Sequence, residues 1–214
     1  MSSNVYTSRA AERVLFLERF ENPAKVHRNG GILVGDPVIK DGMVCTGSER
    51  AEMAVAASRF GSSQLSFEWK FSPDFDWNDD NISYISDASP STRYTLLKYN
   101  SASSYSLRFY CGGTNVLSAA LAPWAAYWNA GEENTVIVSC DASGSNQMYL
   151  NGTLIQSSAT AWTPSLDLAL LVLGSANGGG SNFAGTFHHL AIRATLLTQA
   201  DVDAIESGRL WTYI

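Results

Sequence analysis

The densest run of acidic residues lies at positions 74–81, where Asp and Asn alternate with other side chains. Side-chain oxygens spaced two residues apart could gather around a hard cation such as Ca²⁺. The candidate metal ligands are Asp74, Asp76, Asn78 and Asp80. The segment departs from an EF-hand loop, because Asp79 and Ile85 hold the places where Gly and Glu are needed. Calcium is therefore the one cofactor that we consider, and the alternative is a polar loop whose side chains cap turns.

A second group of candidate residues is aromatic and follows Pro123. Exposed Trp and Tyr rings stack on sugar faces or anchor a protein partner, because they combine a large apolar surface with a polar group. We assign Trp128 to the core and keep Trp124 and Tyr127 as candidate ligand-binding residues.

Three polar side chains on predicted strands are candidates for catalysis. Glu68 is expected to be an exposed strand residue, and it lacks the second carboxylate that a retaining glycosidase needs about 5 Å away. His188 and His189 are adjacent, so in a regular strand they point to opposite faces and only one can face a given groove. Because paired carboxylates, a nucleophile elbow, a phosphate loop and a metal-ligand cluster are all missing from the sequence, we predict that the protein is not an enzyme.

Charge and composition limit the classes of partner. The chain has 214 residues and a formal net charge of −6, so it lacks the basic field that nucleic acids require. It contains neither a signal peptide pattern nor an apolar run of roughly 18 residues, so we expect no membrane insertion. Cys45, Cys111 and Cys140 are too few and too widely spaced for a disulfide framework, and each is predicted to be a small buried hydrophobe.

Alternation of apolar and polar residues indicates the elements that position these side chains. Residues 64–71 alternate strictly and predict a half-buried strand. Residues 94–99 and 106–111 predict one antiparallel hairpin, and residues 135–141 and 147–150 predict another. Strands and turns recur in this way from about residue 30 to residue 194. The pattern predicts an all-β fold with two antiparallel sheets packed as a sandwich.

The C-terminal third contains more specific local patterns. The Asn151-Gly152 pair favours a type I′ turn between two short strands. Residues 166–174 are nearly continuous in apolar character, which is typical of a strand covered on both faces. A capping pattern at residues 198–201 predicts one short helix at residues 199–207.

The sequence shows no internal linker or repeat that would divide it. We expect residues 14–214 to form a single sandwich domain. Residues 1–13 precede the first predicted strand and are expected to form an N-terminal arm or lead-in that is able to reach a neighbouring molecule.

The order of these C-terminal patterns resembles the concanavalin A-like lectin/glucanase superfamily, in particular its laminin G-like modules. The matching stretches are residues 136–144, Met148-Tyr149-Leu150-Asn151-Gly152, Leu173-Gly174-Ser175, Phe183-Ala184-Gly185-Thr186-Phe187, residues 190–193 and residues 197–205. The resemblance implies a jelly-roll sandwich with a short closing helix.

The resemblance, together with a single domain that lacks a leader, suggests a non-catalytic virion-surface protein. We expect a bacteriophage capsid decoration or fibre component, assembled in the host cytoplasm and bound to other virion proteins or to copies of itself. One alternative is a carbohydrate-binding lectin module that contacts a cell-surface glycan. Another is a glycan hydrolase or lyase with a degenerate motif.

Overall fold

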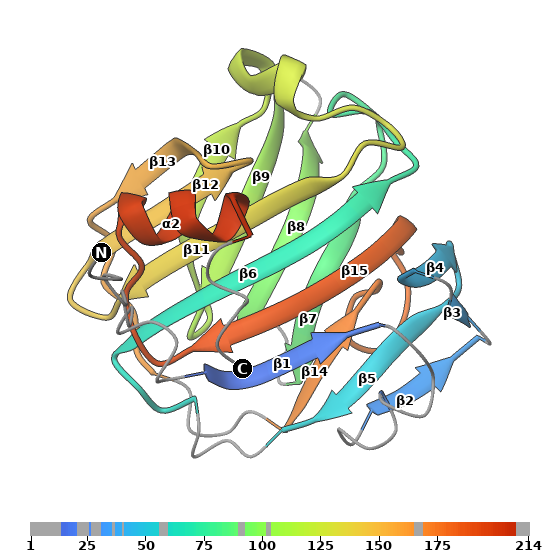
Figure 1. The fold of residues 1–214 in the computed structure, drawn as a ribbon, viewed down its shortest axis with the longest axis horizontal. Helices are drawn as coiled ribbons and strands as arrows, with labels where there is room; N and C mark the ends of the chain where they lie inside the picture. Colours follow the sequence, from blue (N-terminus) through green and yellow to red (C-terminus); the bar gives the residue numbers. More distant parts are fainter. Residues whose placement is uncertain are drawn as a thin grey trace, which may run out of the picture.

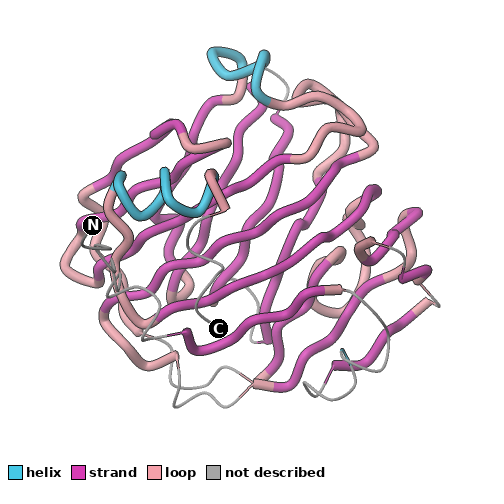
Figure 2. The backbone as a smooth tube through the Cα atoms, viewed as in Figure 1, coloured by secondary structure: helices cyan, strands magenta, loops and turns pink. Residues whose placement is uncertain are grey.

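The structure is a computed structural model, shown as a ribbon in Figure 1 and as a backbone tube in Figure 2. The residues it describes are 14–20, 26, 31–35, 37–39, 41–55, 60–89, 93–101, 104–164 and 169–208. The N-terminal arm predicted at residues 1–13 lies outside this part of the chain.

Two antiparallel sheets pack face to face, which confirms the predicted fold class. Sheet A has eight strands in the order β13 (Thr153–Ser158), β12 (Ser145–Leu150), β11 (Asn134–Asp141), β6 (Gln64–Pro73), β15 (Ala184–Arg193), β4 (Met43–Thr46) and β3 (Val38–Ile39), with β1 (Val14–Arg19) also paired to β15. Sheet B has seven strands in the order β10 (Thr114–Ala120), β9 (Ser104–Cys111), β8 (Tyr94–Ser101), β7 (Ser83–Ser89), β14 (Leu170–Leu173), β5 (Arg50–Ala54) and β2 (Gly31–Val34). The predicted hairpins β8–β9 and β11–β12 both form.

Aromatic side chains fill the space between the sheets. The Phe67 ring on β6 stacks against Trp69 at 5.4 Å, and it meets Tyr94 and Phe109 of sheet B at 5.2 Å each. Each of these four side chains is at most 1% exposed. The alternation predicted for residues 64–71 therefore points its apolar face into the core, as expected.

The other face of β6 differs from the prediction of a half-buried strand. Ser66 and Glu68 are also completely buried, although they point away from the core. The segment after β15 lies over this outer face of sheet A, where the Ser66 hydroxyl donates a hydrogen bond to the Thr195 carbonyl at 2.5 Å. Polar residues on this strand are therefore covered by chain that lies more than 120 positions away in the sequence.

The predicted C-terminal helix is α2 (Gln199–Glu206), which Figure 1 shows across the outer face of sheet A. Thr198 and Asp201 form its capping box, and Val202 and Ile205 pack on Ile137 and Tyr149 of the sheet. None of the helices in the part of the chain that the structure describes has the length and apolar content of a membrane span.

Local turn chemistry also agrees with the sequence. Asn151 and Gly152 have φ values of 47° and 79°, so the β12–β13 hairpin has the predicted type I′ turn, which requires positive φ at both positions. In β14, Leu171 and Val172 point to opposite faces and both are buried, as expected for a strand that is covered on both sides. All three cysteines are free thiols in the interior.

Candidate functional site

The acidic loop, residues 74–81 directly after β6, surrounds a buried lysine. The Lys98 side chain on β8 is completely buried, and its ammonium group donates hydrogen bonds to the carbonyl oxygens of Asp79 and Asn81, the latter at 2.9 Å. The Asp79 carboxylate lies 3.8 Å from the same nitrogen. Lys98 thus supplies a positive charge to the loop in which the sequence suggested a calcium ion.

Aromatic rings complete the surroundings of this ammonium group. Its nitrogen lies 5.3 Å from the centre of the Phe75 ring and 5.8 Å from that of Tyr105, within the range of cation–π attraction. Burial lowers the pKa of Lys98, and the nearby charges of Asp79 and Asp80 oppose this shift.

The predicted metal ligands are spread along the loop and act separately. Asp76 accepts a hydrogen bond from the Ala130 amide at 3.0 Å, and Asp80 accepts one from the Tyr105 hydroxyl at 2.8 Å. Asp74 and Asn78 are exposed. Across the described ranges, no three His, Cys, Asp or Glu side chains are placed to hold a metal ion. The calcium site stays a prediction, and these contacts fit the alternative of a polar loop that caps turns.

The two predicted ligand-binding aromatics lie on the 3-10 helix η3 (Ala122–Tyr127). Trp124 is half-buried, Tyr127 is 42% exposed, and their rings meet edge to face at 6.0 Å. Trp128 is fully buried and donates its indole N–H to the Phe75 carbonyl at 3.2 Å, which confirms its assignment to the core.

The structure brings the aromatic pair and the acidic loop to the same end of the sandwich. The Leu121 amide donates to the Tyr105 carbonyl, and the Tyr105 hydroxyl donates to Asp80, so η3 starts near the acidic loop. Just after η3, the Ala130 amide donates to Asp76 of the same loop. In Figure 1 this end of the molecule lies at the top, where η3 and the loop after β6 are neighbours. We call this surface the rim and define it by Trp77, Tyr105, Trp124, Tyr127, Asp76 and Asp80.

Two aromatic members of the rim were not among the residues predicted from the sequence. Trp77 and Tyr105 are partly exposed, and their rings meet edge to face at 5.7 Å. Trp77 lies inside the acidic run, and Tyr105 follows the β8–β9 turn. Their positions next to loops were the only feature of the sequence that could have indicated exposed aromatic rings. The rim therefore combines two partly exposed aromatic pairs with carboxylates, which is the chemistry of a surface that stacks on and hydrogen-bonds to a polar ring.

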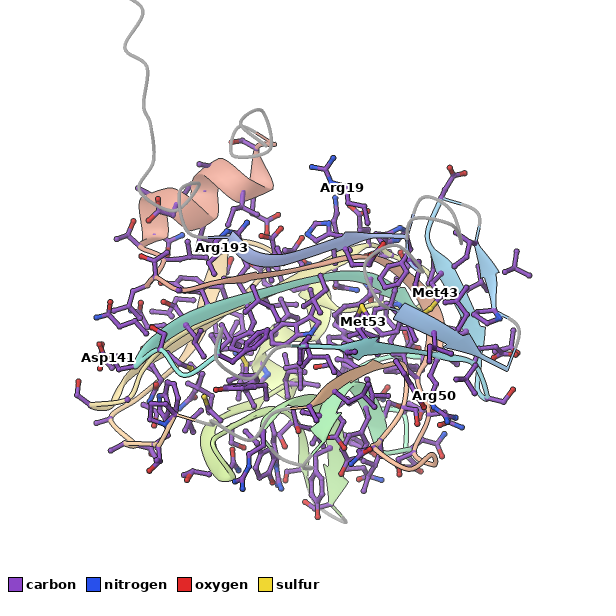
Figure 3. The ribbon with its side chains drawn as sticks, turned by 90° about the horizontal axis from the view of Figure 1, so that it is seen from below. Arg19, Met43, Arg50, Met53, Asp141 and Arg193 are labelled. Atoms are coloured by element: carbon purple, nitrogen blue, oxygen red, sulfur yellow. The ribbon has the colours of Figure 1, made fainter. Side chains whose placement is uncertain are left out.

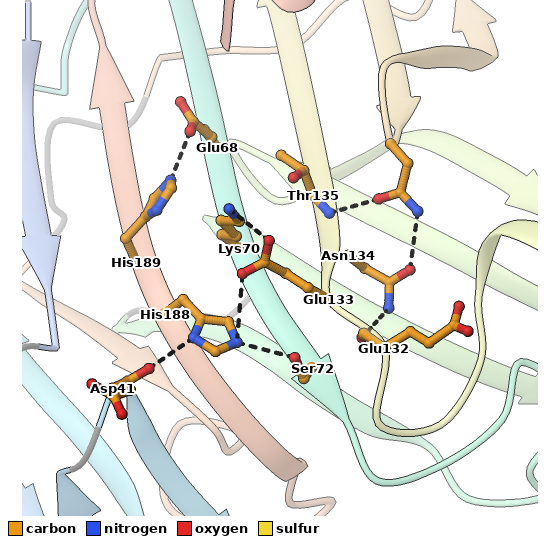
Figure 4. Close-up of polar contacts among 11 residues, drawn as sticks. Asp41, Glu68, Lys70, Ser72, Glu132, Glu133, Asn134, Thr135, His188 and His189 are labelled. Atoms are coloured by element: carbon orange, nitrogen blue, oxygen red, sulfur yellow. Dashed lines mark hydrogen bonds and ion pairs between the residues drawn. The ribbon is translucent and has the colours of Figure 1, made fainter. Parts of the chain in front are cut away.

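The residues considered for catalysis lie instead on the outer face of sheet A, shown in Figure 4. The prediction that Glu68 is exposed is wrong. Its side chain is completely buried, one oxygen lies 2.6 Å from His189 Nε2, and the other lies 2.9 Å from an Arg193 nitrogen. Burial alone would raise the pKa of Glu68, but the hydrogen bond from His189 and the charge of Arg193 outweigh it and lower the pKa.

The prediction that His188 and His189 point to opposite faces is also wrong. The pairing of β15 with β6 shifts register between Phe187 and His189, and such a bulge places both rings on the outer face. His188 lies 3.0 Å from the Ser72 hydroxyl and 3.0 Å from the Asp41 carbonyl, while His189 contacts Glu68. Figure 4 shows the two rings side by side on this face.

Neighbouring charges on the outer face of sheet A are paired with each other. The Lys70 ammonium lies 2.6 Å from a Glu133 oxygen, and the other Glu133 oxygen lies 3.9 Å from His188 Nε2. Because Glu68 is buried between His189 and Arg193, a sugar cannot reach its carboxylate without displacing covering chain. This arrangement stabilises the sheet face and leaves the rim as the better candidate for binding.

Comparison with solved structures places the fold among proteins of several functions. Domain 4 of AbnA, a GH43 extracellular arabinanase from Geobacillus stearothermophilus solved with arabinotriose, is 15% identical with a TM-score of 0.63, over 91% of this chain and 98% of that one. The receptor-binding domain of botulinum neurotoxin C/D mosaic serotype is 11% identical with a TM-score of 0.63, over 93% and 52%. Trypanosoma rangeli sialidase in complex with sialic acid is 12% identical with a TM-score of 0.60, over 82% and 29%.

These likenesses concern the fold alone, and the chain spans about half of the neurotoxin domain and under a third of the sialidase. No curated protein matches the chain in sequence. The family model of the concanavalin A-like lectin/glucanases superfamily matches residues 47–203, which is most of the sandwich. The chain therefore belongs to the concanavalin A-like lectin/glucanases superfamily.

Proposed function

We propose that this chain is a non-catalytic binding module that recognises a carbohydrate through the rim. The observation that carries the proposal is the pair of aromatic contacts, Trp77 with Tyr105 and Trp124 with Tyr127, at one end of the sandwich. Aromatic faces stack on the C–H surface of sugar rings, and adjacent carboxylates accept hydrogen bonds from sugar hydroxyls. The Asp80 carboxylate accepts a hydrogen bond from the Tyr105 hydroxyl, and Asp76 precedes Trp77 in the chain. Both carboxylates are exposed and offer such acceptors.

The solved structures of similar fold support this proposal at the level of analogy. Two of them were determined with a sugar, arabinotriose in one and sialic acid in the other. The acidic character of the rim favours a neutral oligosaccharide, since an anionic sugar would be repelled by Asp76 and Asp80.

The experiment is a screen of neutral oligosaccharides, followed by calorimetric titration of the best ligand against matched variants. Trp124→Ala should weaken binding about tenfold or more, because loss of a stacked indole removes on the order of 1.5–3 kcal/mol. Tyr110→Ala is the matched control, since Tyr110 is a partly exposed aromatic residue on the outer face of sheet B. If Tyr110→Ala abolishes binding while Trp124→Ala does not, the rim is the wrong surface.

The non-catalytic part of the proposal is tested with the same ligand. Prolonged incubation should leave the oligosaccharide intact, with no new reducing ends. Release of shorter sugars at a rate that depends on the protein concentration would show that the chain is an enzyme.

The virion-surface role predicted from the sequence remains a prediction. The rim is compatible with it, because a decoration or fibre protein uses such a surface to contact a cell-surface glycan. Purification of assembled particles that contain this chain would support that role.

A further inference from the structure

We propose that Ser72 on β6 is an activated nucleophile that accepts an acyl group from an activated ester, with His188 on β15 as its general base. The Ser72 hydroxyl oxygen lies 3.0 Å from His188 Nε2 on the outer face of sheet A. Each molecule accepts one acyl group, so the inference is a modification site and is independent of the proposed function.

The hydrogen bonds of His188 determine which ring nitrogen acts as the base. Nδ1 lies 3.0 Å from the Asp41 carbonyl oxygen, and because a carbonyl only accepts hydrogen bonds, Nδ1 carries the proton. In the neutral ring Nε2 is then the acceptor, and the Ser72 hydroxyl donates to it. Figure 4 shows Ser72 and Asp41 on either side of the ring. A nucleophile, a base and a group that orients the base are thus in contact, which is the arrangement that activates a serine.

The turn between β3 and β4 is shaped to hold this ring. Asp41 has a φ of 54°, which is uncommon for a residue with a side chain. Gly42 has a φ of 143°, and a Cβ atom there would lie 2.6 Å from the Phe187 carbonyl oxygen and 3.2 Å from His188 Nδ1. The turn therefore brings the Asp41 carbonyl to the imidazole through a close approach that requires glycine at the next position.

The bulge in β15 is a second backbone irregularity at the same place. The register with β6 shifts between Phe187 and His189, and regular alternation would have turned His188 to the face opposite His189. Bulges are frequent next to active sites, where they redirect a side chain. Two irregular segments of backbone thus converge on one hydrogen-bonded pair, which favours a chemical role for that pair.

Charge and access also favour transfer to Ser72. A Glu133 carboxylate oxygen lies 3.9 Å from His188 Nε2, and the other oxygen lies 2.6 Å from the Lys70 ammonium group. A negative charge at this distance stabilises the imidazolium that forms when His188 takes the serine proton. The His188 side chain is 25% exposed and Ser72 is half-buried, so a small ester reaches the hydroxyl from solvent.

The transfer is an acyl substitution. The Ser72 oxygen attacks the carbonyl carbon of the ester while its proton moves to His188 Nε2. The tetrahedral intermediate then expels the alcohol oxygen of the donor, which takes the proton from Nε2. One C–O bond to Ser72 forms, one C–O bond of the donor breaks, and one alcohol is released without any change in oxidation state.

The test is incubation of the full chain with p-nitrophenyl acetate, followed by peptide mapping with mass spectrometry over time. Acetylation of Ser72 should be about 100-fold faster or more than that of Ser118, because a positioned base contributes about 10²–10⁴-fold. Ser118 is the internal control, since it is an exposed strand serine on β10 of the other sheet. Absence of acetyl groups on Ser72, or equal rates at the two serines, would overturn the proposal.

Two variants separate activation from a structural role of the hydrogen bond. His188→Asn retains an amide that is able to donate toward Asp41 but has no base, so acetylation of Ser72 should slow about 100-fold. Ser118→Ala is the matched control and should leave the Ser72 rate unchanged. An unchanged rate in His188→Asn would show that His188 is not the base. Mapping of wild type still decides whether Ser72 is activated if His188→Asn folds poorly.

Discussion

At the scale of single residues, the acidic loop is held by a cation that belongs to the chain itself. Lys98 is completely buried, yet its nitrogen meets the Asp79 and Asn81 carbonyls and two aromatic rings. An unpaired buried ammonium would cost several kcal/mol, so these contacts offset its loss of hydration. The rim therefore depends on one side chain that reaches it from the interior of sheet B.

Replacing this side chain should destabilise the protein through the loop. Lys98→Met preserves the apolar stem but leaves two carbonyl oxygens without a donor. We therefore expect the free energy of unfolding to fall by about 1–3 kcal/mol. Urea denaturation measures the change. Lys70→Met is the matched control, because Lys70 makes a surface ion pair with Glu133 and should change stability by less than about 1 kcal/mol. Equal losses in the two variants would contradict the role assigned to Lys98.

Glu49 predicts a pH dependence at the corner between β4 and β5. Its carboxylate accepts the Thr46 amide at 2.6 Å and the Ser48 amide at 3.2 Å, and these bonds lower its pKa from 4.5 to about 2. A carboxylate with a lowered pKa stabilises the fold above the unfolded value of 4.5, and the contribution is lost as the pH falls toward 2. We expect Glu49→Gln to cost about 1 kcal/mol at pH 7, after allowance for solvent screening, and almost nothing at pH 2. Thermal melts of both proteins across this range measure the difference.

At the scale of elements, the β12–β13 hairpin also positions η3. Asn151 has the positive φ of the type I′ turn, and its side chain accepts the Thr135 amide at 2.7 Å and donates to the Tyr127 carbonyl at 2.9 Å. A single turn residue thus joins three elements. It fixes the end of η3 that carries Tyr127 on the rim.

Two substitutions separate these roles of Asn151. Asn151→Gly retains the backbone freedom and loses only the side-chain bonds, whereas Asn151→Ala adds strain from the positive φ. We expect Asn151→Gly to lower the free energy of unfolding by about 1–2 kcal/mol and Asn151→Ala to lower it by about 1 kcal/mol more, as measured by urea denaturation. The reverse order of stability would show that the turn conformation contributes little.

Elements determined by local chemistry were predictable, and those determined by distant contacts were not. The Asn151-Gly152 turn and the capping box at Thr198 depend on neighbours within three residues, so the local sequence is sufficient to predict them. The bulge at His188 depends on pairing with β6, more than 110 positions away, and the burial of Glu68 depends on His189. Trp77 and Tyr105 of the rim were not predicted for the same reason, because the rim is formed by loops that lie far apart in the sequence.

At the scale of the whole molecule, one aromatic cluster connects the two sheets. Figure 3, a view from below, shows side chains filling the space between them. Phe67 lies at the centre of this cluster, with Trp69 beside it on β6 and with Tyr94 and Phe109 on the opposite sheet. Neither sheet can bury its inner face alone, so both sheets should fold together.

Phe67→Ala tests this cooperativity, since it removes the ring that contacts both layers. We expect the free energy of unfolding to fall by about 3–5 kcal/mol, because a large buried side chain is replaced by a cavity. Phe67→Leu should lower it by less. Tryptophan fluorescence reports the packing of the buried tryptophans, Trp69 among them, while far-UV circular dichroism reports the strands. In a single cooperative unit the two signals follow one urea transition that shifts to lower concentration in both variants. A transition that splits in Phe67→Ala, with fluorescence lost before the strands, would mean that the sheets hold together by separate contacts and that residues 14–214 do not form one cooperative domain.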